Sequence, residues 1–130
     1  MCIRDSHRPV NINLIKIKLP ISALTSITHR LAGMYIFFIT FPLSVFLFYL
    51  SISSSESFLN LTNTLIGSFY ISTFVAFSYL VLWYHILTGV RHLIMDMHIG
   101  ESLEASKYSS IFVLFLWGLS VIATFVVMFI

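Results

Sequence analysis

Charged residues and cysteine are both scarce in this 130-residue chain. Seven Lys or Arg and five Asp or Glu make up only 9% of the sequence, whereas soluble domains carry about a quarter charged residues. The single cysteine excludes an internal disulfide, and it excludes an iron–sulfur cluster held by this chain alone. The sequence contains neither a glycine-rich phosphate loop nor paired catalytic carboxylates. A net charge of +2 gives no support for nucleic-acid binding.

Hydrophobic residues, at 58% of the chain, dominate instead. Three segments carry no Asp, Glu, Lys or Arg over a long stretch: Leu31 to Leu50, Leu65 to Val90, and Tyr108 to Ile130. A helix needs about 20 residues to cross roughly 30 Å of hydrocarbon. The sequence therefore predicts an all-α membrane protein with three transmembrane helices, at about residues 21–50, 65–95 and 108–130.

The distribution of basic residues predicts the orientation of these helices. All seven lie in the N-terminal segment or around the second loop, whereas the first loop, residues 51–64, holds one acid and no base. The positive-inside rule then places the N-terminus in the cytoplasm and the C-terminus outside. Because the connections are short, we expect an up-down-up arrangement that forms part of a heteromeric helix bundle.

The chain shows no repeat and no internal domain boundary. Residues 1–6 match no feature of the rest, and we interpret them as a possible non-native extension. Residues 7–130 then form a single membrane-anchor domain. Within it, Pro42 should kink the first helix, and the serine-rich residues 51–57 should form a turn on the outer side.

Polar residues gather at the cytoplasmic ends of the first two predicted helices. Residues three and four apart share one side of a helix, and this spacing defines a stripe on each: Ser22, Ser26, His29, Arg30 and Gly33 on the first, and His85, Thr88, Gly89, His92 and Asp96 on the second. Both stripes end at the same membrane boundary, so neighbouring helices would present them to a shared volume. Snorkelling toward lipid headgroups is an equal alternative for Arg91, His92 and His98.

His85 is the first candidate for function. It lies six residues before Arg91, roughly 9 Å inside the membrane boundary, and hydrocarbon tolerates an ionisable group only where something compensates for the lost water. One interpretation is a neutral imidazole hydrogen-bonded to a neighbouring helix. The other is a ligand of b-type haem, which is held by one histidine from each of two facing helices. Since this chain offers a single deep histidine, the second ligand would come from another subunit.

Three motifs in order give the chain a family resemblance. They are Arg8-Pro9-Val10-Asn11, then Ser26-x-x-His29-Arg30-x-x-Gly33, then His85-x3-Gly89-x-Arg91-His92-x3-Asp96. Together with the number and length of the spans, they resemble the cytochrome b membrane-anchor subunits of succinate dehydrogenase, respiratory complex II, in its proteobacterial form. The resemblance covers nearly the whole chain, from Arg8 to Ile130.

The resemblance implies a role for each residue that matches the family motifs. His85 corresponds to the axial ligand of a haem b that is shared with a companion small anchor subunit. Ser26, Arg30 and Asp96 correspond to residues at or near the ubiquinone site. His29, Arg30 and His92 correspond to the region of the haem propionates.

The resemblance also implies that the chain is not an enzyme alone. Succinate oxidation would occur on a flavoprotein subunit, and electrons would cross an iron–sulfur subunit to ubiquinone, linking the tricarboxylic acid cycle to the respiratory chain in a bacterial inner membrane. Two alternatives stay open: the anchor subunit of a fumarate reductase, which works in the opposite direction, and a haem-free packing or assembly subunit that uses its polar stripes for helix contacts.

Overall fold

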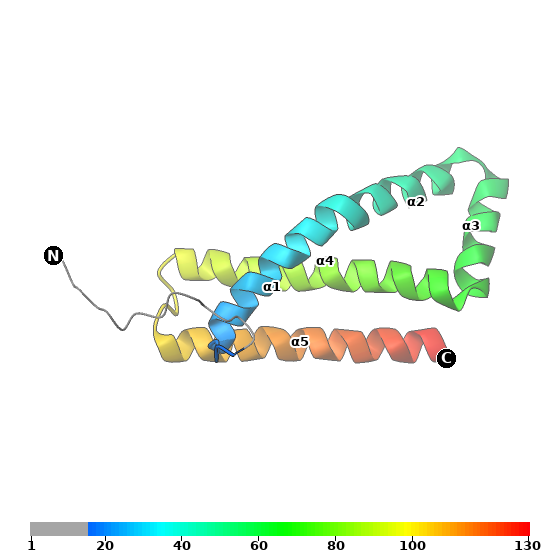
Figure 1. The fold of residues 1–130 in the computed structure, drawn as a ribbon. Helices are drawn as coiled ribbons and strands as arrows, with labels where there is room; N and C mark the ends of the chain where they lie inside the picture. Colours follow the sequence, from blue (N-terminus) through cyan, green and yellow to red (C-terminus); the bar gives the residue numbers. More distant parts are fainter. Residues whose placement is uncertain (1–15) are drawn as a thin grey trace.

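The computed structural model describes residues 16–130, and all the regular secondary structure in that range is helical. Three helices are long and apolar enough to cross a membrane: Ile21–Ser53, Phe69–Asp96 and Leu103–Phe129. They run up, down and up, as Figure 1 shows, with the C-terminus at the end of the molecule opposite the start of the first helix. The predicted all-α fold with three spans is therefore confirmed, whereas residues 1–6 lie outside the described range.

The first long helix is built from α1 (Ile21–Tyr35), a π-helical turn η1 (Ile36–Thr40) and α2 (Phe41–Ser53). The π-helical turn ends two residues before Pro42, whose ring would clash with the carbonyl of Phe38 in an uninterrupted α-helix. At 33 residues, the combined helix is about 50 Å long, well beyond the thickness of the hydrocarbon. Figure 1 shows it inclined to α4 and α5, which shortens its reach along the membrane normal.

The connection between the first and second spans contains a helix that the sequence analysis assigned to a loop. α3 (Ser55–Gly67) follows α2 after one extended residue, Ser54, whose hydroxyl accepts the N–H of Ser57 at 3.0 Å. α4 (Phe69–Asp96) then begins at Phe69, four residues later than the predicted start near 65. Ser54 is thus a helix cap, and the expected serine-rich turn at 51–57 is limited to this one residue.

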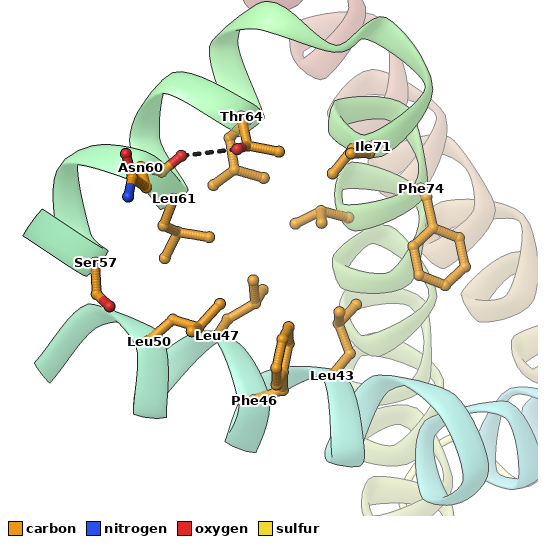
Figure 2. Close-up of a pocket in the computed structure, with 12 residues that line it drawn as sticks. Leu43, Phe46, Leu47, Leu50, Ser57, Asn60, Leu61, Thr64, Ile71 and Phe74 are labelled. Atoms are coloured by element: carbon orange, nitrogen blue, oxygen red, sulfur yellow. Dashed lines mark hydrogen bonds between the residues drawn. The ribbon is translucent and has the colours of Figure 1, made fainter. Parts of the chain in front are cut away.

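α3 closes the end of the bundle at which α2 ends and α4 begins. A cavity of about 420 Å³ lies between α2, α3 and α4. Figure 2 shows Leu43 and Leu47 of α2 and Leu61 of α3 pointing into it. Polar side chains stay at the edge of this cavity, where the hydroxyl of Thr64 donates to the carbonyl of Asn60 at 2.7 Å. α3 therefore turns apolar side chains into the cavity and leaves polar side chains at the edge of the cavity.

The third span, α5 (Leu103–Phe129), starts five residues before the predicted position of 108. Ser102 caps its first turn by accepting the N–H of Ala105 at 3.2 Å, and Glu104 lies in that turn, where a negative charge is favourable. The prediction began the helix at 108 because Glu104 and Lys107 are charged and so lie outside the charge-free segment. Charged residues do not prevent a helix from extending beyond the hydrocarbon.

Small hydroxyl residues form the interior of the helix bundle. The side chains that are almost fully buried, at less than 2% exposure, are Thr25, Thr40, Thr88, Ser78 and Ser110. Most large apolar side chains are exposed on the outer faces of the three spans. This is the inverse of a soluble core and is typical of membrane helices, which pack through small residues and turn large apolar ones toward lipid or other subunits.

Candidate functional site

The two predicted polar stripes meet where α1 crosses α4. The imidazole rings of His29 and His85 stack in parallel, with their centroids 4.0 Å apart and 8° between their planes. The ring of His92 meets His29 edge-on, at a centroid distance of 5.2 Å. Spacing alone had placed these residues on facing sides of two helices, and the structure brings all three imidazoles into one cluster.

A backbone hydrogen bond fixes the tautomer of His85. Its Nδ1 lies 3.1 Å from the carbonyl oxygen of His29. A carbonyl can only accept, so Nδ1 carries the hydrogen and the lone pair of the neutral ring is on Nε2. Nε2 makes no hydrogen bond to any residue in the range 16–130. This is the arrangement of histidines that bind metals through one nitrogen while the other donates to a carbonyl.

Thr88 holds His29 in its stacked position. The hydroxyl of Thr88 donates to the carbonyl of Tyr84 at 2.8 Å, one turn earlier in α4. With its single hydrogen used, it accepts from Nδ1 of His29 at 2.6 Å. The same turn of α4 is tied to α1 a second time, because the hydroxyls of Tyr84 and Thr28 share a hydrogen bond. Tyr84 and Thr28 were not among the residues predicted for the site.

Two glycines allow the rings to come this close to the opposite backbone. A Cβ added at Gly33 would lie 3.1 Å from Cε1 of His85, and one added at Gly89 would lie 3.3 Å from Cε1 of His29. Both distances are shorter than ordinary van der Waals contact. The two glycines that the motifs singled out therefore serve the histidine pair directly.

The remaining predicted site residues surround this cluster without joining its hydrogen bonds. Ser26 is half-buried one turn from Arg30 on α1, Arg30 is exposed, and Asp96 is exposed at the end of α4. The charges of Arg30 and Asp96 both fall within electrostatic range of His92. In the part of the chain that the structure describes, the side chains of Ser26, Arg30 and Asp96 make no hydrogen bond to another residue, so their polar groups are available to a ligand or a partner.

Arg91 does not extend toward the membrane surface as the snorkelling alternative predicted. Its side chain is only 5% exposed and connects α4 to α5: Nε donates to the hydroxyl of Ser109 at 3.0 Å, and Nη2 donates to the carbonyl and hydroxyl of Ser106 at 3.1 and 3.0 Å. His98, by contrast, is exposed and pairs with Glu101 at 2.7 Å. Snorkelling is therefore wrong for Arg91.

Within residues 16–130, no three His, Cys, Asp or Glu side chains are arranged so that they could hold a metal ion by themselves. The site instead offers one imidazole, that of His85, whose tautomer is fixed by a backbone carbonyl and whose Nε2 lone pair is free. This ring is stacked on a second imidazole. Such a chain can give a single ligand to a metal centre whose coordination is completed by another subunit.

Comparison with known proteins agrees with the family resemblance of the sequence motifs. The family model described as succinate dehydrogenase/fumarate reductase transmembrane subunit matches residues 4–127. The chain is 33% identical over 106 residues to the succinate dehydrogenase cytochrome b556 subunit of Coxiella burnetii, covering 82% of this chain and 84% of the relative.

Two further relatives agree with this one. The cytochrome b560 subunit of succinate dehydrogenase from Chondrus crispus is 36% identical over 115 residues, covering 85% of this chain and 86% of the relative. The cytochrome b556 subunit from Rickettsia prowazekii is 35% identical over 102 residues, covering 77% and 76%. The family suggested by the motifs is thus confirmed, and the chain belongs to the succinate dehydrogenase/fumarate reductase transmembrane subunits.

Proposed function

We propose that this chain is the haem b-binding membrane anchor of a succinate:ubiquinone oxidoreductase, with its N-terminus on the cytoplasmic side of a bacterial inner membrane. The observation that carries the proposal is the state of His85. Its Nδ1–H is held by the carbonyl of His29, and its Nε2 is left without a partner in the described chain. The names of the relatives, which are cytochrome b subunits of succinate dehydrogenase, supply the class of metal centre.

The residues present are suited to hold a haem. Gly33 has no Cβ, so the His85 ring can lie against the backbone of α1, where an added Cβ would be 3.1 Å from its Cε1. His85 would hold the iron through Nε2, and the companion small anchor subunit would supply a second ligand. His29, Arg30 and His92 would face the propionates: the Arg30 guanidinium and the His92 imidazole can donate to carboxylates there, and Nε2 of His29 can do so when the ring is protonated. When bound, haem supplies a one-electron redox centre between the spans.

This chain's part in quinone reduction would be to bind and polarise the substrate. Ubiquinone has an apolar tail and two polar carbonyls, so its site should combine membrane depth with a few donors near the aqueous boundary. Ser26 donates through its hydroxyl, and Arg30 favours negative charge on a quinone oxygen that is being reduced. Asp96, exposed at the end of α4, lies at the boundary from which protons arrive.

The proposal is tested on membranes that contain this chain together with the subunits encoded beside it. We expect a dithionite-reduced minus oxidised spectrum of the b type and succinate-dependent reduction of ubiquinone. A correctly inserted complex without any b-type absorbance would overturn the proposal and favour a haem-free packing subunit. A b-type spectrum with fumarate reduction greatly exceeding succinate oxidation would assign the chain to a fumarate reductase.

Gly33→Val should weaken haem retention. The added side chain would begin 3.1 Å from the His85 ring, which cannot move away without breaking its hydrogen bond to His29. Overpacking of this kind costs about 1–3 kcal/mol, which corresponds to roughly 5- to 150-fold weaker retention. Haem per complex, measured by pyridine haemochrome, is the readout. Gly118→Val is the control, because nothing lies within 4 Å of a Cβ at Gly118; equal haem content in the two variants would contradict the role of Gly33.

Thr88→Val should loosen the histidine pair without removing a ligand. The substitution nearly keeps the shape of the side chain and removes the hydroxyl that holds Nδ1 of His29, at a cost of about 1 kcal/mol. We expect a lower midpoint for loss of the haem spectrum on heating. Thr73→Val is the matched control on the same helix, since the buried Thr73 hydroxyl has no partner in the described chain. If the two variants lose haem at the same temperature, Thr88 does not position His29.

A further inference from the structure

A groove runs between α4 and α5 on the face of α4 that is turned away from the histidines. Its volume is about 580 Å³, and its lining on α4 extends from Trp83 to Met95. At about 1.5 Å per residue these positions span roughly 18 Å along the helix. The lining positions on α4 lie on the opposite side of the helix from His85 and His92.

The groove is apolar over most of its length, with one charged residue near its cytoplasmic end. Only Arg91 and Ser109 contribute polar side chains to a lining made otherwise of glycine, alanine and larger apolar residues. Arg91 lies five residues before the end of α4 at Asp96, about 8 Å along the helix. The guanidinium is therefore near headgroup depth, while the other end of the groove, at Trp83 and Leu116, is deeper in the membrane.

Arg91 is a buried cation whose partners in the described chain are all neutral. A guanidinium has five N–H donors; three of them bond to Ser106 and Ser109, and Nη1 bonds to no residue in the range 16–130. The ion pair present in that range joins His98 and Glu101, not Arg91. Burying an uncompensated charge costs several kcal/mol, so this site calls for an anion from outside the described residues 16–130.

We propose that the groove binds one anionic phospholipid, with its phosphate on Nη1 of Arg91 and an acyl chain along α4 and α5. The charge is complementary, and an arginine fork matches the oxygens of a phosphate. The apolar length below Arg91 suits hydrocarbon. A carboxylate of the companion anchor is disfavoured on one ground that rests on the proposed function: to share a haem at His85, that subunit must occupy the opposite face of α4.

The test measures lipid retention by the purified complex. Delipidated complex is supplied with dioleoylphosphatidylglycerol or dioleoylphosphatidylcholine, washed in neutral detergent, and examined by native mass spectrometry. We expect one tightly retained phosphatidylglycerol and no equivalent phosphatidylcholine. Arg91→Gln should reduce retention about tenfold or more, as expected for loss of a charged hydrogen bond. Lys107→Gln, which removes an exposed cation on the neighbouring α5, should change retention less than about twofold.

A second variant keeps the test decisive if Arg91→Gln fails to assemble. Ser109→Asp would give Arg91 a carboxylate within this chain, at the position where Ser109 now meets Nε at 3.0 Å, and should displace the lipid while keeping the cation. Retention of phosphatidylglycerol by Ser109→Asp, or equal retention of the two lipids by wild type, would overturn the lipid site. The reduced haem spectrum should be unchanged in Ser109→Asp, so failure of this proposal is distinguishable from failure of the haem assignment.

Discussion

His85→Ala is expected to abolish the b-type reduced minus oxidised spectrum of the complex. The Nδ1–H of His85 donates to the backbone carbonyl of His29, which leaves the lone pair of the ring on Nε2. The substitution removes this nitrogen, and no other histidine of the cluster has its tautomer fixed by a backbone carbonyl. Under the proposed assignment, a haem iron would lose one of its two protein ligands and would be held less firmly. The His29 ring, stacked at 4.0 Å, is held by Thr88 and is not free to replace it.

His98→Ala is the matched control for this experiment. His98 lies at the same end of the molecule, is exposed, and pairs with Glu101 outside the cluster, so its removal should leave the spectrum unchanged. Membrane insertion of both variants is checked by immunoblot. A normal b-type spectrum in a correctly inserted His85→Ala complex would contradict the ligand assignment. Quinone reduction in this variant should fall less than the b-type absorbance, because the residues proposed to bind quinone do not include His85.

The three spans could be predicted from the sequence because their signal is local. A charge-free stretch of bilayer length is visible without knowing what it contacts, and the ends of the helices differ from prediction only where caps lie among charged or serine residues. α3 was missed because its polar residues resemble a loop. Its apolar positions Phe58, Leu61 and Leu65 have helical spacing, which was a usable signal together with the cap at Ser54.

The site could be predicted to the level of facing stripes and no further. Helical spacing brought His29 and His85 to one volume, but the stacked geometry and the bond to the His29 carbonyl depend on how α1 crosses α4. The burial of Arg91 depends on a third helix, because Ser106 and Ser109 of α5 enclose its guanidinium. Read along α4 alone, an arginine near a helix end is indistinguishable from one that snorkels.

Arg30→Ala is expected to lower succinate–ubiquinone reduction by about tenfold to a hundredfold, the range for loss of a hydrogen bond from a charged donor of about 1.5–3 kcal/mol. Assembly should be retained, because the exposed Arg30 side chain bonds to no residue in the described chain and its removal leaves no buried group unpaired. The assay is reduction of a water-soluble ubiquinone analogue by succinate, with flavoprotein content measured in parallel to normalise for assembly.

Two comparisons separate a role toward quinone from a general effect of charge. Lys107→Ala removes an exposed cation at the same end of the bundle and should leave turnover within about twofold. Arg30→Lys should recover part of the activity, because it restores the charge without the fork of donors. If Arg30→Ala turns over at the wild-type rate, the quinone assignment fails. If it lowers flavoprotein content and turnover equally, Arg30 instead contacts a partner subunit, since no residue of this chain in the described range depends on it.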